Sequence, residues 1–186
     1  TLFGTDFLGQ DVWSRFLFGG RSILFLAATS TLIGVLMGAA LGVLAAYVKG
    51  ALSALIMRTF DIIIAFPGIL LALLLVSMFG SSSALIILAN VIVKIPRIGR
   101  IIHGAAVSVV EKDFVSSATA IGESRSRIVF REILPNVTST LLVEANLRFT
   151  YSISTIASLA FLGFTSDPTG ANWGTMVQEN SIAIIL

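Results

Sequence analysis

The chain has 186 residues, enough for one domain, and 56% of them are hydrophobic while only 12% are charged. That charged share is about half of the share in an ordinary soluble domain, so the composition argues against a soluble protein and indicates a membrane protein. The formal net charge of +2 argues against a nucleic-acid partner. The absence of cysteine excludes disulfides, and the single histidine, His103, cannot build a metal site alone.

The N-terminal segment and the first apolar run come first in the chain. Residues 1–21 are polar and glycine-containing, and we expect an extracytoplasmic loop or short surface helix there. Residues 22–48 contain no charge and are long enough to span a bilayer, which takes roughly 20 apolar residues. Gly34, Gly38 and Gly42 recur every four residues in this run. The spacing predicts a flat stripe for close helix packing, although glycine is common in membrane helices for other reasons too.

Further apolar runs predict an all-α, polytopic bundle that forms one domain over residues 1–186. Pro67 is expected to kink the second span, and Pro96 to mark where the third span leaves the membrane. Lys94, near that end, is expected to extend its ammonium group to the interface and to have no further role. The expected later spans are residues 62–79, 84–103 and 137–164, with the start of another at 178–186. We expect the sequence to be an excised piece that lacks a first span and most of a last one.

A polar block interrupts the apolar runs at residues 111–135. We expect two short amphipathic helices that are capped by Asp113 and Ser124, joined at Gly122 and closed by Pro135. Helices this short need a surface to rest on. The spacing alone leaves open whether the block is an interfacial connector or a docking site.

The positive charges predict the orientation of the spans. If the block is cytoplasmic, only Arg15 and Arg21 lie outside, and Arg148 lies within a span. The cytoplasmic side then holds nine basic residues: Lys49, Arg58, Lys94, Arg97, Arg100, Lys112, Arg125, Arg127 and Arg131. This distribution matches the positive-inside rule and places residues 1–20 and 165–178 outside.

The fourth expected span contains the polar residues Glu144, Asn146 and Arg148. A charge in mid-membrane costs at least about 2.5 kcal/mol, and Glu144 and Arg148 have the spacing and order of an intrahelical ion pair. Two interpretations remain open. In the first, the three residues line a translocation path and contact a zwitterionic peptide. In the second, the pair of Glu144 and Arg148 faces the bundle and only holds helices together.

Motifs for catalysis are absent from the sequence. There is no GxxxxGK[ST] phosphate loop, no HExxH and no GxSxG, so we expect no enzyme activity, no bound cofactor and no metal in this chain. A self-sufficient channel or secondary transporter remains an alternative, although the internal repeats common in secondary transporters are not seen here.

The polar block resembles a known cytoplasmic motif, in which Glu-Ala-Ala is followed after three residues by Gly and then by a Leu-Pro pair. Ala118, Gly122 and residues 134–135 fall at that spacing, whereas Ser116 and Ser117 replace the Glu and the first Ala. Glu132 stands where the motif has an Ile, two residues before the Leu-Pro pair, with Ile133 beside it. The motif is typical of permease subunits of binding-protein-dependent ABC importers. Five segments also resemble permeases of the dipeptide, oligopeptide and nickel type, in the same order along the chain. They are LFGTDFLGQDVWSRFLFGGRSIL, MRTFDIIIAFPGILLAL, IPRIGRIIH, FLGF and NWGTMVQE.

The resemblance implies the MetI-like fold of a type I ABC importer permease in the prokaryotic plasma (inner) membrane. It also implies partners: a second, similar permease subunit, two cytoplasmic ATPases that bind ATP and magnesium, and an external substrate-binding protein. Residues 111–135 would carry the coupling helix. Its expected contacts with an ATPase are Ser116, Ser117, Ala118, Gly122, Glu123, Ser124 and Arg125. The implied substrate is a dipeptide or oligopeptide, with nickel or glutathione as the alternative within the family.

Overall fold

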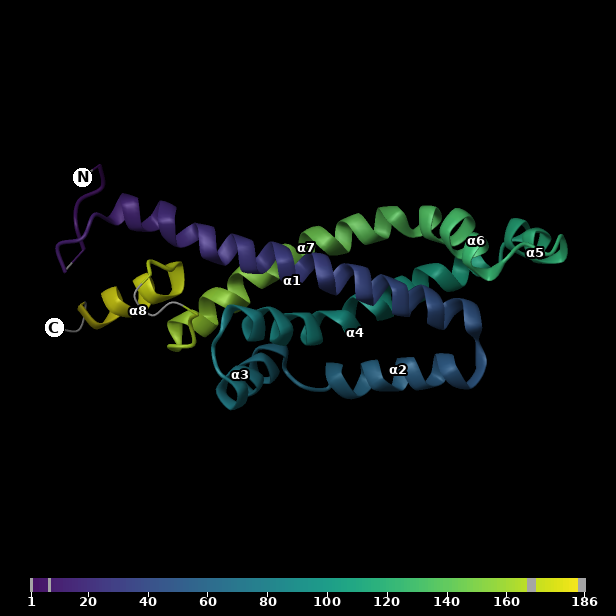
Figure 1. Cartoon of the computed structure of the whole chain (residues 1–186), viewed down its shortest axis with the longest axis horizontal. Helices are drawn as coiled ribbons and strands as arrows, with labels where there is room; N and C mark the ends of the chain where they lie inside the picture. The colour runs from purple at the N-terminus through teal and green to yellow at the C-terminus, as the bar shows by residue number, and fades with distance from the viewer. Residues whose placement is uncertain (1, 7, 167–169, 184–186) are drawn as a thin grey trace. The chain divides into compact units, whose positions relative to one another are not determined.

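The computed structural model describes residues 2–6, 8–166 and 170–183, and these fold as helices joined by short turns. This confirms the expected all-α class; the one pair of bridged extended residues described is Thr5 and Asp11. The helices are α1 (Val12–Val48), α2 (Gly50–Ile64), α3 (Gly68–Phe79), α4 (Ser83–Val110), α5 (Asp113–Ala120), α6 (Arg125–Ile128), the π-helix η1 (Val129–Ile133), α7 (Leu134–Phe161) and α8 (Trp173–Ala183). Figure 1 labels the α-helices along the chain.

The chain divides into two compact units, and α1, α4 and α7 each contribute residues to both. Unit 1 contains residues 1–30, 69–90 and 149–186, and unit 2 contains residues 31–68 and 91–148.

Within the described residues, α1 is long and apolar enough to cross a membrane by itself. It has 37 residues and begins at Val12, so the helix starts about ten residues before the run that was predicted to span. The α2 and α3 pair passes the same test only when taken together, and it is bent by 84°. Pro67 lies at that bend, where it cannot donate a backbone hydrogen bond, so the expected kink is confirmed as a complete break. By contrast, α4 continues through Pro96 to Val110, and Pro96 ends no helix.

The core of unit 2 brings α1 against α4. Ala39 and Val43 of α1 pack in one buried cluster with Ile98 and Ile102 of α4. A Cβ atom added at Gly42 would lie 2.5 Å from the backbone oxygen of Gly99, and one added at Gly38 would lie 2.9 Å from the Ile98 Cβ. The glycine stripe therefore faces another helix at backbone contact, which confirms the close-packing interpretation.

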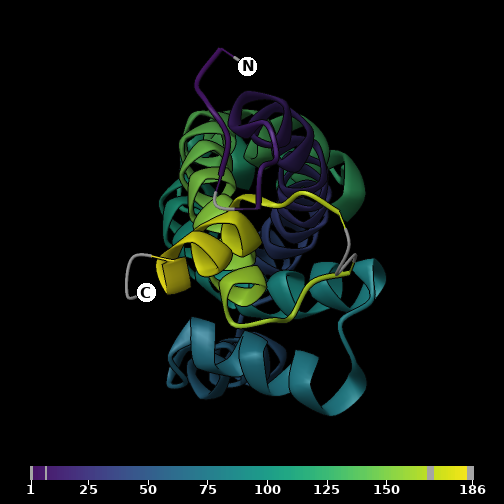
Figure 2. The ribbon, with the colours of Figure 1, turned by 90° about the vertical axis from the view of Figure 1, so that its left-hand side faces the viewer.

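Unit 1 packs α8 against the beginning of α1 and the end of α7 (Figure 2). The indole of Trp173 donates a hydrogen bond of 2.8 Å to the carbonyl of Phe16 and stacks on its ring, with centroids 5.2 Å apart. A Cβ atom at Gly174 would lie 2.1 Å from the carbonyl oxygen of Ala157. The loop predicted at residues 165–174 includes residues 167–169, which lie outside the described residues, as do residues 184–186 of the last expected span.

Candidate functional site: a helical connector fixed to the core of unit 2

The polar block folds as two short helices on either side of a glycine, as predicted. Gly122 has φ 86°, a conformation that glycine adopts without strain, and it separates α5 from α6. Three details differ from the prediction. Asp113 is the first residue of α5 rather than its cap, and Ser124 stands at the N-cap of α6 without the side-chain cap bond. Pro135 closes nothing either, because η1 continues directly into α7, whose second residue is Pro135. Pro135 lacks a backbone N–H, so the continuous helix has one donor fewer there, and the π-helical turn η1 lies directly before it.

The apolar side of the connector rests on the core of its own unit. Val115 of α5, Ile128 of α6 and Ile133 of η1 are 3%, 0% and 0% exposed, and they belong to the same buried cluster as Ala106 and Val137. Burying such side chains is worth about 1.5–3 kcal/mol each, so the connector is held to α4 and α7 rather than only lying on a membrane surface.

The polar side of the connector is open. Ser116, Ser117, Gly122, Ser124 and Arg125 are exposed, while Ala118 and Glu123 are half-buried. These are the seven residues that the resemblance nominates as contacts, and the fold brings them to one short segment on either side of the Gly122 turn. Glu123 also lies 3.9 Å from the Arg127 guanidinium, one turn further on, in a weak surface pair.

Two exposed apolar side chains accompany this polar face. Ile121 is 82% exposed and directly precedes Gly122, and Phe130 of η1 is 68% exposed. The helix α5 ends at Ala120, and the turn directs Ile121 outward, away from the core that holds Val115.

A cleft lies beside α5 in unit 2. It has a volume of about 470 Å³ and is lined by the ends of α1 and α4, by Ser116 and Thr119 of α5, and by Arg125. Figure 1 shows α5 beyond the residues where α1 and α4 end. Arg125 forms no ion pair within the described part of the chain, so its guanidinium is available to a carboxylate from another molecule.

The charged residues of α7 form the predicted pair. Arg148 donates hydrogen bonds of 2.9 and 2.7 Å from Nε and Nη2 to Oε2 of Glu144, and both side chains are largely buried. Asn146 lies two residues from each, on another side of the helix, and is exposed. The structure therefore joins two of the three candidate path residues and separates the third.

Lys94 departs from its prediction. It is 5% exposed, and its Nζ donates a hydrogen bond of 3.4 Å to Oγ1 of Thr31 on α1. Its side chain also packs against Gly34, because a Cβ atom added at Gly34 would lie 3.2 Å from the Cβ atom of Lys94. The ammonium group therefore remains inside the unit instead of extending to the interface. The sequence signal for this buried position of Lys94 was the glycine stripe, because Gly34 leaves the space that the Lys94 side chain fills.

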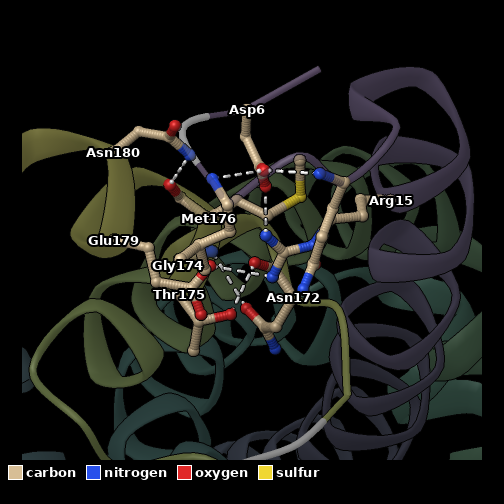
Figure 3. A network of polar contacts seen from close by, with 10 residues as sticks. Asp6, Arg15, Asn172, Gly174, Thr175, Met176, Glu179 and Asn180 are labelled. Atoms are coloured by element: carbon tan, nitrogen blue, oxygen red, sulfur yellow. Dashed lines mark hydrogen bonds and ion pairs between the residues drawn. The ribbon is translucent and has the colours of Figure 1, made fainter. Parts of the chain in front are cut away.

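A second polar network lies in unit 1, at the side expected to be external (Figure 3). Arg15 contacts Asp6 through Nη1 at 2.7 Å and Glu179 of α8 through Nη2 at 2.8 Å. The backbone N–H of Gln10, at 2.8 Å, lowers the pKa of the Asp6 carboxyl below its usual value of 3.8, and Arg15 acts in the same direction. One arginine thus ties the N-terminal segment and α8 to α1, a link that local sequence patterns could not reveal.

Metal ligation has no support among the residues that the structure describes, because none of their His, Asp and Glu side chains gather in a group of three. The connector presents a polar face instead, together with the exposed apolar side chains of Ile121 and Phe130 and the guanidinium groups of Arg125 and Arg131, neither of which forms an ion pair in the described part of the chain.

Comparison with known proteins gives the class and then the family. The fold is similar to that of a chain in the solved inward-facing structure of the MetNI methionine ABC transporter, with a TM-score of 0.75 and 18% identity over 91% of this chain and 82% of that one. The molecule is therefore a helical protein with the MetI-like fold of ABC importer permeases. The family of binding-protein-dependent transport system inner membrane components matches residues 22–186, and the chain belongs to this family.

Several relatives carry names that describe transport. The glutathione transport system permease protein GsiD of Pectobacterium atrosepticum is 39% identical over 95% of this chain and 58% of its own length. A putative peptide transport system permease protein of Brucella suis is 38% identical, with 96% and 60% covered. The dipeptide transport system permease protein DppC of Alkalihalophilus pseudofirmus is also 38% identical, with 96% and 59% covered. The chain thus spans less than two thirds of the length of these relatives.

Proposed function

We propose that this chain is a permease subunit of an ATP-driven importer that forms half of a translocation path for dipeptides or oligopeptides delivered by an external binding protein. The observation that carries the proposal is the connector, whose apolar face is fixed to the core of unit 2 while its polar face remains open. A connector held this way moves together with α4 and α7 when a partner moves it. The names of the peptide and dipeptide relatives support the substrate class.

The proposed partners are supported by the family to which the chain belongs. A cytoplasmic ATPase would receive Ser116, Ser117, Ala118, Gly122, Glu123, Ser124 and Arg125 in a groove, with Ile121 as an apolar anchor. A second permease subunit, of a different sequence, would complete the path, and two ATPases would supply the energy from ATP and magnesium. This chain itself would bind neither nucleotide nor metal.

We also propose that the chain crosses the inner membrane several times. The helices α4 and α7 have 28 residues each, or about 42 Å at ~1.5 Å per residue, which exceeds the hydrocarbon thickness of about 30 Å. Their charges reduce their mean hydropathy, but the Glu144 and Arg148 pair and the Lys94 hydrogen bond show how these charges are accommodated. The Glu144 and Arg148 pair is largely buried, which favours a role in holding the bundle over a direct substrate contact.

Glutathione import is the second candidate function, because a relative named for it is 39% identical to this chain. Both candidates use the same docking arrangement and differ in substrate. Transport of radiolabelled dipeptide and glutathione by the reconstituted complex, with each candidate binding protein in turn, separates them.

Disulfide cross-linking tests the docking proposal directly, since the chain contains no cysteine. Ser124→Cys in the full-length subunit is combined with single cysteines in the predicted groove of each ATPase. We expect a specific cross-link whose yield changes with ATP. The matched control is Ser14→Cys, which is also exposed but lies at the side expected to be external. No cross-link from Ser124 at several groove positions in an intact complex would leave residues 111–135 as an interfacial connector and favour an ATPase-independent transporter.

The same two cysteines test the topology. A membrane-impermeant maleimide should label Ser14→Cys in intact cells and Ser124→Cys only after permeabilisation. The reverse pattern would contradict the proposed orientation.

A further inference from the structure

A second cleft in unit 2 has no role in the proposed coupling mechanism. It lies between the end of α1, the beginning of α2 and the end of α4, and has a volume of about 370 Å³. That volume lies within the range of about 300–1,000 Å³ typical of small-molecule sites. Lys49, Ser53, His103 and Glu111 line it together with alanine and valine side chains. The cleft therefore combines an apolar wall with positive, negative and polar groups.

The ionisable groups of this cleft are available to a ligand. Elsewhere in unit 2, Arg148 pairs with Glu144 and Arg100 pairs with Asp61. Within the described residues, the side chains of Lys49, His103 and Glu111 form neither a hydrogen bond nor an ion pair. Because the ammonium of Lys49 and the carboxylate of Glu111 line one cleft without pairing with each other, a ligand that carries both a negative and a positive group can bind between them.

The backbone at Lys49 adds an independent observation. Lys49 has φ 53°, and it is the one non-glycine residue with a positive φ in the described part of the chain. This region disfavours residues that carry a side chain, and such outliers are concentrated at ligand sites. Glycine would relieve the strain, yet a cation occupies the position. The next residue, Gly50, has no heavy atom within 4 Å of an added Cβ atom, so the backbone there borders open space.

The position of the cleft narrows the class of ligand. The positive-inside distribution places the ends of α1 and α4 at the cytoplasmic surface, where phospholipid headgroups lie beside the helices. A ligand with a phosphate and an ammonium group matches Lys49 and Glu111, whereas a purely anionic headgroup would be repelled by Glu111. A primary ammonium donates hydrogen bonds to a carboxylate, and a quaternary ammonium cannot.

We propose that this cleft binds the phosphoethanolamine headgroup of an inner-leaflet phospholipid. The phosphate lies at Lys49, with Ser53 and His103 as further partners, and the ammonium lies at Glu111. An acyl chain follows the apolar wall between α2 and α4. The inference is independent of the substrate that the transporter carries.

Native mass spectrometry of the complete purified transporter tests this proposal. The complex is titrated with palmitoyl-oleoyl phosphatidylethanolamine, and in parallel with the phosphatidylglycerol and phosphatidylcholine of the same chains. We expect preferential retention of phosphatidylethanolamine, and about fivefold weaker binding in Lys49→Gln and in Glu111→Gln, which corresponds to ~1 kcal/mol for each partly exposed charge pair. The matched control is Lys112→Gln, which removes an exposed cation next to Glu111 that does not line the cleft.

Further measurements separate the alternatives. Lys49→Gly removes the charge and relieves the backbone strain, so it should fold at least as well as the native chain and still lose the lipid. Retention of phosphatidylethanolamine by Lys49→Gly would overturn the proposal. Equal retention of phosphatidylglycerol that is insensitive to Glu111→Gln would also overturn it, as would displacement of the lipid by inorganic phosphate, which would identify a site for free phosphate.

Discussion

Two isoleucines seven residues apart provide a sharp test of how the connector works. Ile128 is fully buried in the core cluster of unit 2, whereas Ile121 is 82% exposed at the tip. Truncation of each to alanine removes the same atoms, so the two variants separate attachment of the connector from its docking. Ile128→Ala should loosen attachment, and Ile121→Ala should weaken docking.

The expected magnitudes follow from burial. Ile128→Ala removes three buried carbon atoms, worth about 2.4 kcal/mol at ~0.8 kcal/mol each, and the cavity left behind brings the loss to about 2–5 kcal/mol. For a domain of this size such a loss lowers the Tm by roughly 5–15 °C. Ile121→Ala removes little buried surface and should change stability by less than about 0.5 kcal/mol.

The assays measure both properties in the complete transporter. Tryptophan fluorescence during heating gives the Tm, and ATPase binding to permease-containing nanodiscs gives the docking affinity. We expect Ile128→Ala to lower the Tm and to transport less substrate per ATP hydrolysed. Ile121→Ala should keep the Tm and weaken ATPase binding about tenfold, the loss of an apolar anchor worth ~1.4 kcal/mol. Equal effects of the two variants on the Tm would refute the assignment of a fixed inner face and an open outer face.

Three further predictions concern helix packing, pH and the buried ion pair. Gly42→Ala places a methyl group 2.5 Å from a backbone oxygen of α4 and should destabilise the protein by about 1–3 kcal/mol, measured by thermal unfolding. The backbone N–H of Gln10 lowers the pKa of Asp6, so Asp6 stabilises the fold above its unfolded-state pKa, and this stability is lost as the pH falls through the lower folded-state pKa. Asp6→Asn should therefore flatten the acid limb of a plot of Tm against pH. Glu144→Gln combined with Arg148→Met should retain peptide transport in proteoliposomes, because the two charges pair with each other within α7 and are removed together, so that no unpaired buried charge is left.

Each of these predictions has a control or a contrary outcome. Gly104→Ala is the control for packing, since no heavy atom lies within 4 Å of its added Cβ and alanine favours a helix. An acid limb that is identical with and without the Asp6 carboxylate would contradict the pH prediction. Loss of transport of some peptides but not others, in a double variant that folds and hydrolyses ATP, would place Glu144 and Arg148 in the translocation path.

Local patterns in the sequence were sufficient for several features of the site. Gly122 separates two short helices because a glycine accepts a positive φ that ends α5, and Pro67 breaks the α2 and α3 pair because it lacks a backbone donor. The pairing of Glu144 with Arg148 follows from the helical repeat. The predictions for Asp113 and Pro135 failed because helix ends depend on neighbouring turns as well as on local residues.

Contacts between distant residues required the tertiary structure. Lys94 is a boundary residue by its position in the sequence, but Thr31 and Gly34, some 60 residues away, hold it inside unit 2. The links from Arg15 to Glu179 and from Phe16 to Trp173 join opposite ends of the chain. Such contacts depend on which helices pack together, and helical periodicity contains no information on that choice.

By itself, the sequence determined that this is a helical membrane protein with a polar, glycine-hinged connector, because composition, apolar run length and turn chemistry are local properties. Only the tertiary structure decided that the connector's apolar face belongs to the core of unit 2. Val115, Ile128 and Ile133 would suit lipid, a partner or their own bundle equally well by periodicity, and their burial against α1, α4 and α7 selects the third. That packing leaves the polar face open, as the proposed docking of an ATPase requires.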